Sequence, residues 1–361
     1  MMHITHLIAS LEGGGAEKQA LYQLIESKKR DINISLIALS LSEHSKYKLN
    51  EFNINYHIVG KSIPVAFFKI LMILHRNRPN IVSTWLAHMD LIGGIASKLL
   101  RIKWILNERS SAQAYSSKTN QGAINPLLLL LRNFLGKYSD IIIANSLPGK
   151  SYWEDFQLHQ NVNFIPNIIY LNESDDLKKS PIEEPLKQPC ILNVGSLIES
   201  KNCISLINAI AIINKTRNLY LYVIGEGPLE LPLKEHVKSL GLEEKIVFLG
   251  KINDWLPLLH QSEALVHPSL YEGMPNVVLE AINLKCPVLI SKIDAHLSIL
   301  DPHQALFFDP LDDKDLSDKI LELLLNKEES SERSEIAYNS LKIYHPDEIL
   351  KSLSKVYKKI Y

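Results

Sequence analysis

The chain has 361 residues, of which 46% are hydrophobic and 22% are charged, a composition typical of a soluble globular protein. One hydrophobic core rarely organises a chain of this length, so we expect two domains. The basic residues are dispersed and no base-stacking motif accompanies them, which argues against nucleic-acid binding. The longest apolar stretches are interrupted by Lys69 and Arg132, and both are shorter than the roughly 20 apolar residues of a membrane-spanning helix.

The charges are distributed unevenly along the chain. Residues 1–166 contain 18 Lys and Arg against 11 Asp and Glu, a net charge of +7. The remaining residues contain 21 against 29, a net charge of −8. A basic first half suits an anionic ligand or an anionic membrane surface.

The cysteines and the N-terminal residues bear on the compartment. Cys190, Cys203 and Cys286 are scattered, with no CxxC pair or histidine cluster beside them, so neither a disulfide framework nor a zinc site is expected. The opening "MMHITHLIAS" lacks the charged and then long apolar pattern of a signal peptide. These features predict a cytoplasmic protein.

Short apolar runs alternate with amphipathic segments throughout the first half, which predicts parallel strands joined by crossover helices. The predicted strands are residues 3–9, 32–40, 53–59, 79–86, 103–108 and 140–146.

Three strand ends of this half carry candidate ligand-binding residues. "LEGGGAEKQ" places Gly13, Gly14 and Gly15 before a helix, where backbone N–H groups favour a phosphate, although a tight turn needs glycines as well. The spacing is not GxGxxG, which disfavours a nicotinamide or flavin site. His88 follows the fourth strand, with Asp90 as a candidate N-cap, and is weighed evenly between a structural and a catalytic role.

"LNERSS" presents Asn107, Glu108 and Arg109 at the end of the fifth strand, where a solvated loop is the alternative. An acidic, proline-bearing stretch at 170–189 then separates the halves, and we expect domains at 1–166 and 167–344. The alternation restarts, with predicted strands at 190–196, 219–227, 245–251, 264–269, 286–291 and 305–310. Ligands of such sheets sit beyond the carboxyl ends of the strands, and two such ends can frame one cleft.

The second half carries three further motifs. "NVGSLIESKN" leads from a strand through Gly195 to Lys201 before a helix, where an ammonium can reach an anionic ligand, although a surface lysine is the simpler account of this motif alone. "VIGEGP" contains Gly225 and Glu226, a pair that a simple turn would also explain.

The segment "SLYEGMPNVVLEA" holds two glutamates in an otherwise apolar setting. Pro275 fits the first turn of a helix, which predicts that the backbone N–H groups of Gly273 to Asn276 can bind phosphate. Glu272 and Glu280, eight residues apart, would then lie on one helix face. They are expected to address a sugar and a ribose hydroxyl; a hydrolytic acid and base, or a purely structural pair, are the alternatives.

Together these motifs resemble the retaining glycosyltransferases of family 4, which have the GT-B fold of two Rossmann-like domains facing across a cleft. The resemblance covers nearly the whole chain, through "GGGAEKQ", "VGSLIESKN", "VIGEGP", "FLGKIND" and "EGMPNVVLEA". It implies a nucleotide-sugar donor on the second domain, an acceptor on the first, and a last helix, at about 345–361, that crosses back to the first domain.

The resemblance also implies residue roles. Lys201 would neutralise the donor diphosphate, Glu280 would bind the ribose, Glu272 would contact the donor sugar, and His88 would lie near the reacting sugar. The full donor-binding set is Gly195, Ser196, Lys201, Gly225, Glu226, Leu249, Gly250, Gly273, Met274, Pro275, Asn276 and Glu280, and the acceptor-binding set is Gly13, Gly14, Gly15, Asn107 and Arg109. We expect Lys201, Glu272 and His88 to be catalytic.

The chain departs from the family pattern at two positions, because Ser196 stands where many members have arginine and Trp85 where many have histidine. No DxD metal motif is evident, since Asp313 and Asp315 look like a helix start, so no metal or other cofactor is expected.

The sequence thus predicts a glycosyltransferase that moves a sugar from a UDP- or GDP-sugar to a glycan with retention, in surface polysaccharide or lipopolysaccharide assembly. The acceptor is expected to be lipid-linked and the protein peripheral at the inner face of the membrane. A nucleotide-sugar epimerase or hydrolase, a non-catalytic sugar-nucleotide-binding subunit and, more remotely, an oxidoreductase are the alternatives.

Overall fold

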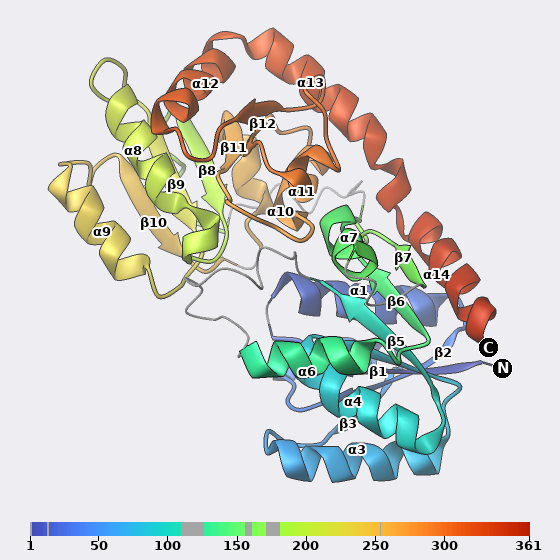
Figure 1. Cartoon of the computed structure of the whole chain (residues 1–361). Coiled ribbons are helices and arrows are strands. Elements are labelled where there is room, and N and C mark those ends of the chain that lie inside the picture. Colours follow the sequence, from blue (N-terminus) through green and yellow to red (C-terminus); the bar gives the residue numbers. More distant parts are fainter. Residues whose placement is uncertain (1, 13, 110–125, 156–160, 171–180, 253) are drawn as a thin grey trace. The chain divides into compact units, whose positions relative to one another are not determined.

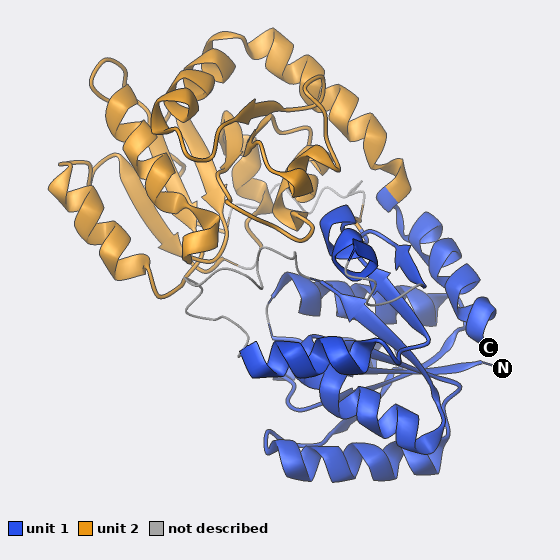
Figure 2. Cartoon of the chain, viewed as in Figure 1, with its two compact units in different colours: residues 1–116, 122–168, 344–361 blue, residues 117–121, 169–343 orange. Residues whose placement is uncertain are grey.

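The computed structural model describes residues 2–12, 14–109, 126–155, 161–170, 181–252 and 254–361. The chain divides into two compact units, shown in Figure 2. Unit 1 consists of residues 1–116, 122–168 and 344–361, and unit 2 of residues 117–121 and 169–343. The last segment of the chain therefore belongs with the N-terminal unit.

Unit 1 is built on a parallel sheet whose seven strands have the order β3-β2-β1-β4-β5-β6-β7 (Figure 1). The six predicted strands are confirmed, and the short β7 was not predicted. The strands are β1 (His3–Ile8), β2 (Asn33–Ala38), β3 (Asn55–Ile58), β4 (Ile81–Trp85), β5 (Lys103–Glu108), β6 (Ile141–Ala144) and β7 (Val162–Phe164).

Successive strand residues point to opposite faces of a sheet, so apolar strands make both faces apolar. Helices cover both faces of this sheet. Ile4 and Ile8 of β1 lie in one core cluster and Leu7 in another. The first cluster is completed by α1 (Gly15–Lys29), α2 (Glu43–Glu51) and α14 (Pro346–Ile360). The opposite face is covered by α3 (Ile63–Asn77), α4 (Ala87–Leu100), α6 (Pro126–Gly136) and α7 (Leu147–Asp155).

The C-terminal helix α14 is an integral part of unit 1. Pro346 occupies its first turn, where a missing N–H is harmless, and His345 accepts a hydrogen bond from the Asp347 N–H. Its apolar stripe, including Leu353, enters the core beside α1. Nε2 of Gln23 also donates to the Tyr357 hydroxyl at 2.7 Å. The end of the chain therefore helps to hold the first unit together.

Unit 2 has a parallel sheet of six strands in the order β10-β9-β8-β11-β12-β13. All six match predicted strands: β8 (Cys190–Val194), β9 (Tyr220–Ile224), β10 (Ile246–Gly250), β11 (Ala264–His267), β12 (Val288–Ser291) and β13 (Leu306–Phe308). Its helices are α8 (Cys203–Ile213), α9 (Glu230–Ser239), α10 (Asn276–Asn283), α11 (Asp294–Leu297), α12 (Asp313–Leu325) and α13 (Lys327–Ser340). Short 3₁₀ turns lie at η2 (Glu199–Lys201), η3 (Leu256–Gln261) and η4 (Leu341–Tyr344).

The strand order reverses once in each sheet. In unit 1 the chain builds β1, β2 and β3 in one direction and then returns to place β4 beside β1; in unit 2 it does the same with β8 and β11. Ligands of such sheets bind beyond the carboxyl ends of the strands at this reversal. We therefore expect a ligand site at the loops that follow β1, β4, β8 and β11.

Candidate functional site

The loops after β8, β9 and β10 of unit 2 are joined by backbone hydrogen bonds. The Gly195 N–H donates to the Ile224 carbonyl at 2.9 Å, and the Gly225 N–H donates to the Gly250 carbonyl at 2.8 Å. The Leu197 N–H donates to the Glu226 carbonyl at 3.0 Å. The structure thus brings Gly195, Gly225, Glu226 and Gly250, predicted separately as donor-binding residues, to one edge of the sheet.

Gly225 is required by this close approach. Its φ is +142°, which side chains other than glycine rarely adopt. A Cβ at this position would lie 1.9 Å from the Gly195 carbonyl oxygen, inside any permitted contact. The glycine of "VIGEGP" therefore allows two backbone loops to touch, which the sequence alone did not indicate.

Glu272 is the centre of the cluster at the end of β11. It lies in the loop between β11 and α10, and its side chain is only 11% exposed. Its Oε1 accepts hydrogen bonds from Ser269 Oγ at 2.8 Å, from His267 Nε2 at 2.9 Å and from the Lys201 ammonium. Three donors, from the end of β11, the loop after it and the turn η2, therefore converge on one carboxylate oxygen.

The surroundings keep this carboxylate ionised. Burial alone would raise the pKa of Glu272, but the charge of Lys201 and the hydrogen bond from His267 outweigh it and hold the pKa well below its ordinary value. Burial lowers the pKa of His267, more than the contact with Glu272 raises it, so the imidazole is neutral. The cluster is thus an ion pair with one neutral imidazole beside it.

A second imidazole lies behind His267. The His296 ring is 5.6 Å from that of His267 between centroids, and its Nδ1 lies 2.7 Å from the Ser291 carbonyl oxygen. Burial, and then the neighbouring His267, lower the pKa of His296 to about 3. Ser291 Oγ in turn donates to the Ser269 carbonyl at 2.5 Å. This second layer fixes the loop that carries Glu272.

Lys201 is positioned by the turn η2, which ends at Asn202 in the left-handed conformation, φ +50°. The Leu270 N–H donates to the Ser200 carbonyl at 2.8 Å and so joins this turn to the loop after β11. The Lys201 side chain is 24% exposed, so a ligand can reach its ammonium. Ser196, the predicted departure, is exposed on the neighbouring loop.

One prediction for the following helix is wrong, and the predicted phosphate site is reduced to the N–H groups of Gly273 and Met274. Helix α10 begins at Asn276, so Glu272 precedes the helix and does not share a helix face with Glu280. The Asn276 N–H donates to the Met274 carbonyl at 3.0 Å and Pro275 has no N–H, so these two residues offer no backbone group to a phosphate. Glu280 lies half-buried within α10, Leu249 within β10.

In unit 1 the predicted phosphate-binding loop carries a carboxylate. Gly14 is the N-cap of α1, which begins at Gly15, and Gly13 lies outside the described residues. The Glu17 side chain folds back so that its Oε2 would lie 2.1 Å from a Cβ on Gly14, and its Oε1 accepts from Ser10 Oγ. An anion at this helix N-terminus would have to displace Glu17, since the dipole already has a negative partner.

Asn107 was predicted to contact the acceptor, and this prediction is wrong. The residue positions Arg109 and presents no exposed group to a ligand. It is fully buried; its Nδ2 donates to Ser83 Oγ and to the Thr84 carbonyl, both at 2.8 Å. Its Oδ1 accepts from Arg109 at 3.1 Å.

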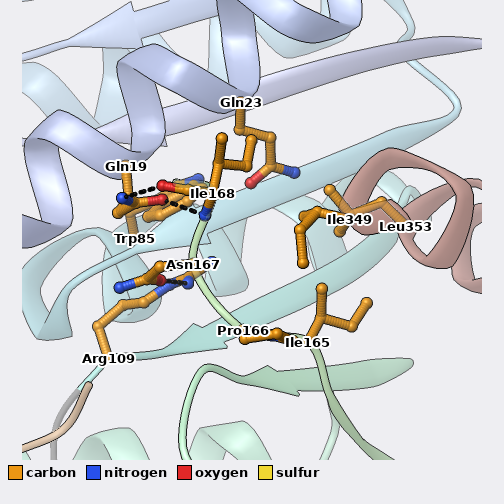
Figure 3. A pocket seen from close by; sticks show the side chains of 10 residues that line it. All are labelled: Gln19, Gln23, Trp85, Arg109, Ile165, Pro166, Asn167, Ile168, Ile349 and Leu353. Carbon is orange, nitrogen blue, oxygen red and sulfur yellow. Dashed lines mark hydrogen bonds between the residues drawn. The ribbon is translucent and has the colours of Figure 1, made fainter. Parts of the chain in front are cut away.

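Arg109 lies 4.1 Å over the centre of the Trp85 ring and also donates to Asn167 at 3.0 Å. Burial lowers the pKa of Arg109 to about 10. It faces a small pocket shown in Figure 3, which also receives α14. The pocket is lined by Gln19, Gln23, Trp85, Arg109, Ile165, Pro166, Asn167, Ile168, Ile349 and Leu353.

His88 is exposed in the first turn of α4, at the strand reversal of unit 1. Asp90 is not the predicted N-cap, because α4 begins at Ala87 and its N-cap is Leu86. Glu108 is not in a solvated loop, because it is the buried last residue of β5. Arg132 of α6 donates to Asp90 at 2.7 Å and to Glu108 at 2.8 Å, and all three side chains are at most 2% exposed. They form a buried ion triad under the sheet edge.

The described residues contain no group of three or more His, Cys, Asp or Glu that could hold a metal ion. Asp313 and Asp315 lie in the first turn of α12, as predicted, and Asp312 caps it by accepting from the N–H groups of Lys314 and Asp315.

Sequence reasoning missed His267 and Ser269 as site residues. The available signal was "HPS" at the end of a predicted strand, five and three residues before Glu272. Because polar side chains at the carboxyl end of a buried strand face the ligand edge, that position alone would have nominated both.

Two family models match consecutive parts of the chain. Residues 13–173 match the model described as Glycosyltransferase Family 4, and residues 174–340 match Glycosyl transferases group 1.

Relatives of known name extend the likeness. An enzyme of Campylobacter jejuni named GalNAc-alpha-(1->4)-GalNAc-alpha-(1->3)-diNAcBac-PP-undecaprenol alpha-1,4-N-acetyl-D-galactosaminyltransferase is 28% identical over 91% of this chain and 90% of its own length. An uncharacterized glycosyltransferase of Methanocaldococcus jannaschii is also 28% identical, over 62% of this chain and 58% of that relative. The crystal structure of Anabaena HepE in complex with UDP-glucose has a TM-score of 0.83, with 16% identity, over 99% of this chain and 100% of that one.

Proposed function

This chain belongs to the GT-B glycosyltransferases, and we propose that it transfers a sugar from a UDP- or GDP-sugar to a hydroxyl of a lipid-linked glycan, with retention at the anomeric carbon. The observation that carries the proposal is the Glu272–Lys201 pair at the strand reversal of unit 2, held by His267 and Ser269. It joins a cation suited to a diphosphate with an ionised carboxylate suited to sugar hydroxyls.

Lys201 is the proposed electrostatic catalyst. As the bond between sugar and diphosphate breaks, negative charge grows on the departing phosphate, and an ammonium already in place stabilises that charge more than it stabilises the bound donor. In the structure the Lys201 ammonium donates to Glu272. A bound diphosphate would share the ammonium, which has three hydrogens to donate. The charge on Lys201 supports chemistry that needs no metal.

Glu272 is the proposed contact to the donor sugar. Its low pKa keeps it an acceptor for sugar hydroxyl groups, and its fixed orientation lets those hydroxyls select one pose. The acceptor hydroxyl would attack from the face that the diphosphate leaves, and the diphosphate oxygen would take its proton. Retention then needs no covalent enzyme intermediate.

The acceptor class rests on the relatives. The Campylobacter enzyme is named for a glycan attached through a diphosphate to undecaprenol, and the similarity covers most of both chains. We therefore propose an isoprenoid diphosphate-linked glycan and a role in surface polysaccharide or lipopolysaccharide assembly at the inner face of the membrane. Arg109, half-buried just after β5, and the exposed His88 are the unit 1 residues proposed to face it.

A donor and acceptor panel tests this function. Thermal-shift measurements with UDP-, GDP- and ADP-sugars identify the donor, and mass spectrometry then follows transfer to an undecaprenyl diphosphate-linked glycan. Formation of an extended glycan supports the proposal. Free sugar or an epimerised donor as the main product, with acceptor present, would overturn it.

A further inference from the structure

Helix α6 of unit 1 exposes its apolar side chains and buries its charge. Leu127, Leu130, Leu131 and Phe134 are 44–65% exposed, whereas the Arg132 side chain is 2% exposed. The exposed residues follow the spacing i, i+3, i+4, i+7, which places them on one helix face. This inverts the arrangement of an ordinary surface helix, whose apolar stripe faces the core.

The buried ion triad fixes this inverted orientation. Arg132 reaches Asp90 of α4 and Glu108 of β5, and Trp153 Nε1 donates to Glu108 at 3.0 Å. Rotating α6 to bury its leucines would remove the guanidinium from two buried carboxylates, which is strongly unfavourable. The buried ion triad therefore keeps the apolar face of α6 directed outward.

The neighbouring helices extend the same surface. Helix α4 packs against both α3 and α6, and Figure 1 shows the three on one side of the unit 1 sheet. Phe68 and Met72 of α3 are 64% and 63% exposed, and Leu99 of α4 is 64% exposed. We call this surface, from Val65 to Tyr138 over these helices, the α3–α4–α6 face. Exposed apolar side chains gathered on neighbouring packed helices are typical of an interaction site.

The charge around this face has one sign. Residues 52–139 include eleven Lys and Arg but only two acidic residues, Asp90 and Glu108, and both are buried in the triad. Lys98 and Lys103 pair with Asp140. Other exposed basic residues on or beside the helices, including Lys69, Arg76, Arg101 and Lys137, can contact an anionic surface.

We propose that the α3–α4–α6 face docks unit 1 on an anionic lipid bilayer. Its leucines and aromatic rings would enter the boundary between headgroups and acyl chains, while the lysines and arginines contact lipid phosphates. Among the described residues, no helix is long and apolar enough to span a bilayer. A second copy of this face is a poor partner, because docking would oppose like charges.

The inference deepens the proposed function by naming the membrane surface at which a lipid-linked acceptor is met. The biological reason for docking rests on the proposed function, but the docking itself does not, because vesicle binding is measured without donor or acceptor. Flotation with phosphatidylcholine vesicles, with and without phosphatidylglycerol, is the test. We expect binding that requires phosphatidylglycerol and weakens as salt is raised.

Two paired variants separate the contributions. Leu130→Ser with Phe134→Ser removes apolar contacts on α6, and Lys69→Glu with Arg76→Glu reverses two charges on α3. Each pair should lower vesicle affinity at least about tenfold. For the α3 pair, each basic residue near an anionic surface contributes about a factor of five. For the α6 pair, each buried large apolar side chain contributes a factor of about ten or more. Leu311→Ser and Lys238→Glu, at exposed positions of unit 2, are matched controls that should bind like the unchanged protein.

Three results would overturn the inference: no binding of the unchanged protein to either vesicle, paired variants that bind normally, or a lipid-free dimer that the α6 variant dissociates in sedimentation. Unchanged thermal unfolding of the variants shows that they fold. Transfer to a water-soluble acceptor with no vesicle binding would refute the docking face alone. Vesicle binding with no transfer to any acceptor would refute the proposed function alone.

Discussion

Nε2 of His267 lies 2.9 Å from Oε1 of Glu272, and the imidazole is buried. Because burial lowers the pKa of His267, the ring is neutral, and the hydrogen must be on Nε2 for the contact with the carboxylate to be favourable. His267 therefore orients Glu272 without adding a second positive charge beside Lys201. The family motif supplies the carboxylate, and a residue outside that motif holds it in place.

Replacing His267 tests this positioning role. His267→Ala should lower kcat by about 10 to 100 fold, the range expected for a lost hydrogen bond to a charged group, with little change in KM. His267→Gln, whose amide can donate from a similar position, should recover part of the loss. Steady-state kinetics of both variants across pH is the measurement. Equal kcat for the alanine variant and the unchanged enzyme would remove His267 from the site.

Lys201→Ala should lower turnover by roughly 100 to 1000 fold, as for other preorganised electrostatic groups, while the affinity for the donor falls less. The loss of positive charge should also raise the pKa of Glu272, so the acid limb of the kcat–pH profile should move to higher pH. Adding Ser196→Arg, at an exposed neighbouring position, should restore part of the activity. Near-normal turnover of Lys201→Ala would mean that the diphosphate binds elsewhere.

Buried neutral histidines predict a loss of stability in mild acid. Burial is the main cause that lowers the pKa of His6 and of His296 to about 3, from 6.5. A lowered histidine pKa means that the unfolded chain binds the proton first, so this contribution is complete above pH 6.5 and falls as pH drops toward 3.

The largest slope is about 1.4 kcal/mol per pH unit for each ring. His296→Asn should make urea unfolding of unit 2 less dependent on pH between 6 and 4, which urea titrations at several pH values can measure. An unchanged slope would show that His296 is protonated in the folded state.

Gly225→Ala should destabilise unit 2 and weaken donor binding, because the new Cβ would lie 1.9 Å from the Gly195 carbonyl oxygen. Gly241→Ala is the matched control: φ is +66° there and nothing lies within 4 Å of the added Cβ. The control should lose about 1 kcal/mol through backbone strain alone. Thermal unfolding with and without a UDP-sugar separates the two effects, and equal losses in both variants would contradict the close loop contact.

Arg132→Met should cost about 3 to 5 kcal/mol of stability in unit 1, because two buried carboxylates lose their shared cation. Lys150→Met is the comparison: it breaks the exposed ion pair with Glu154 at 3.7 Å and should cost less than about 1 kcal/mol. Urea denaturation measures both. Similar small losses would show that the triad does not hold α6.

The strands could be predicted because parallel strands are buried on both faces and read as short apolar runs between amphipathic segments. The missed strand β7 lacks a continuous apolar run, because asparagines flank Val162 in "NVNF", whereas the equally short β13 reads "LFF". The direction of α6 could not be predicted, because its leucine-rich sequence suits burial and only the positions of Asp90 and Glu108 turn Arg132 inward.

The identity of the site residues was predicted more accurately than their arrangement in space. Lys201 and Glu272 were named from motif and spacing, and the structure places them in contact. The helix start at Asn276 was missed, because Pro275 was placed inside the first turn and is the N-cap. His267 and Ser269, at and just after the end of β11, were missed because their strand-end position was not used as a signal, although it marks the ligand edge of the sheet.

The most direct test of the central claim is transfer itself, with the configuration of the new bond read by proton NMR. The unchanged enzyme, supplied with the donor found by thermal shift and an undecaprenyl diphosphate-linked glycan, should form one α- or β-linkage that matches the configuration of the donor. Glu272→Gln, measured beside it, should form far less of the same product. A product of inverted configuration, or equal transfer by the variant, would contradict the account.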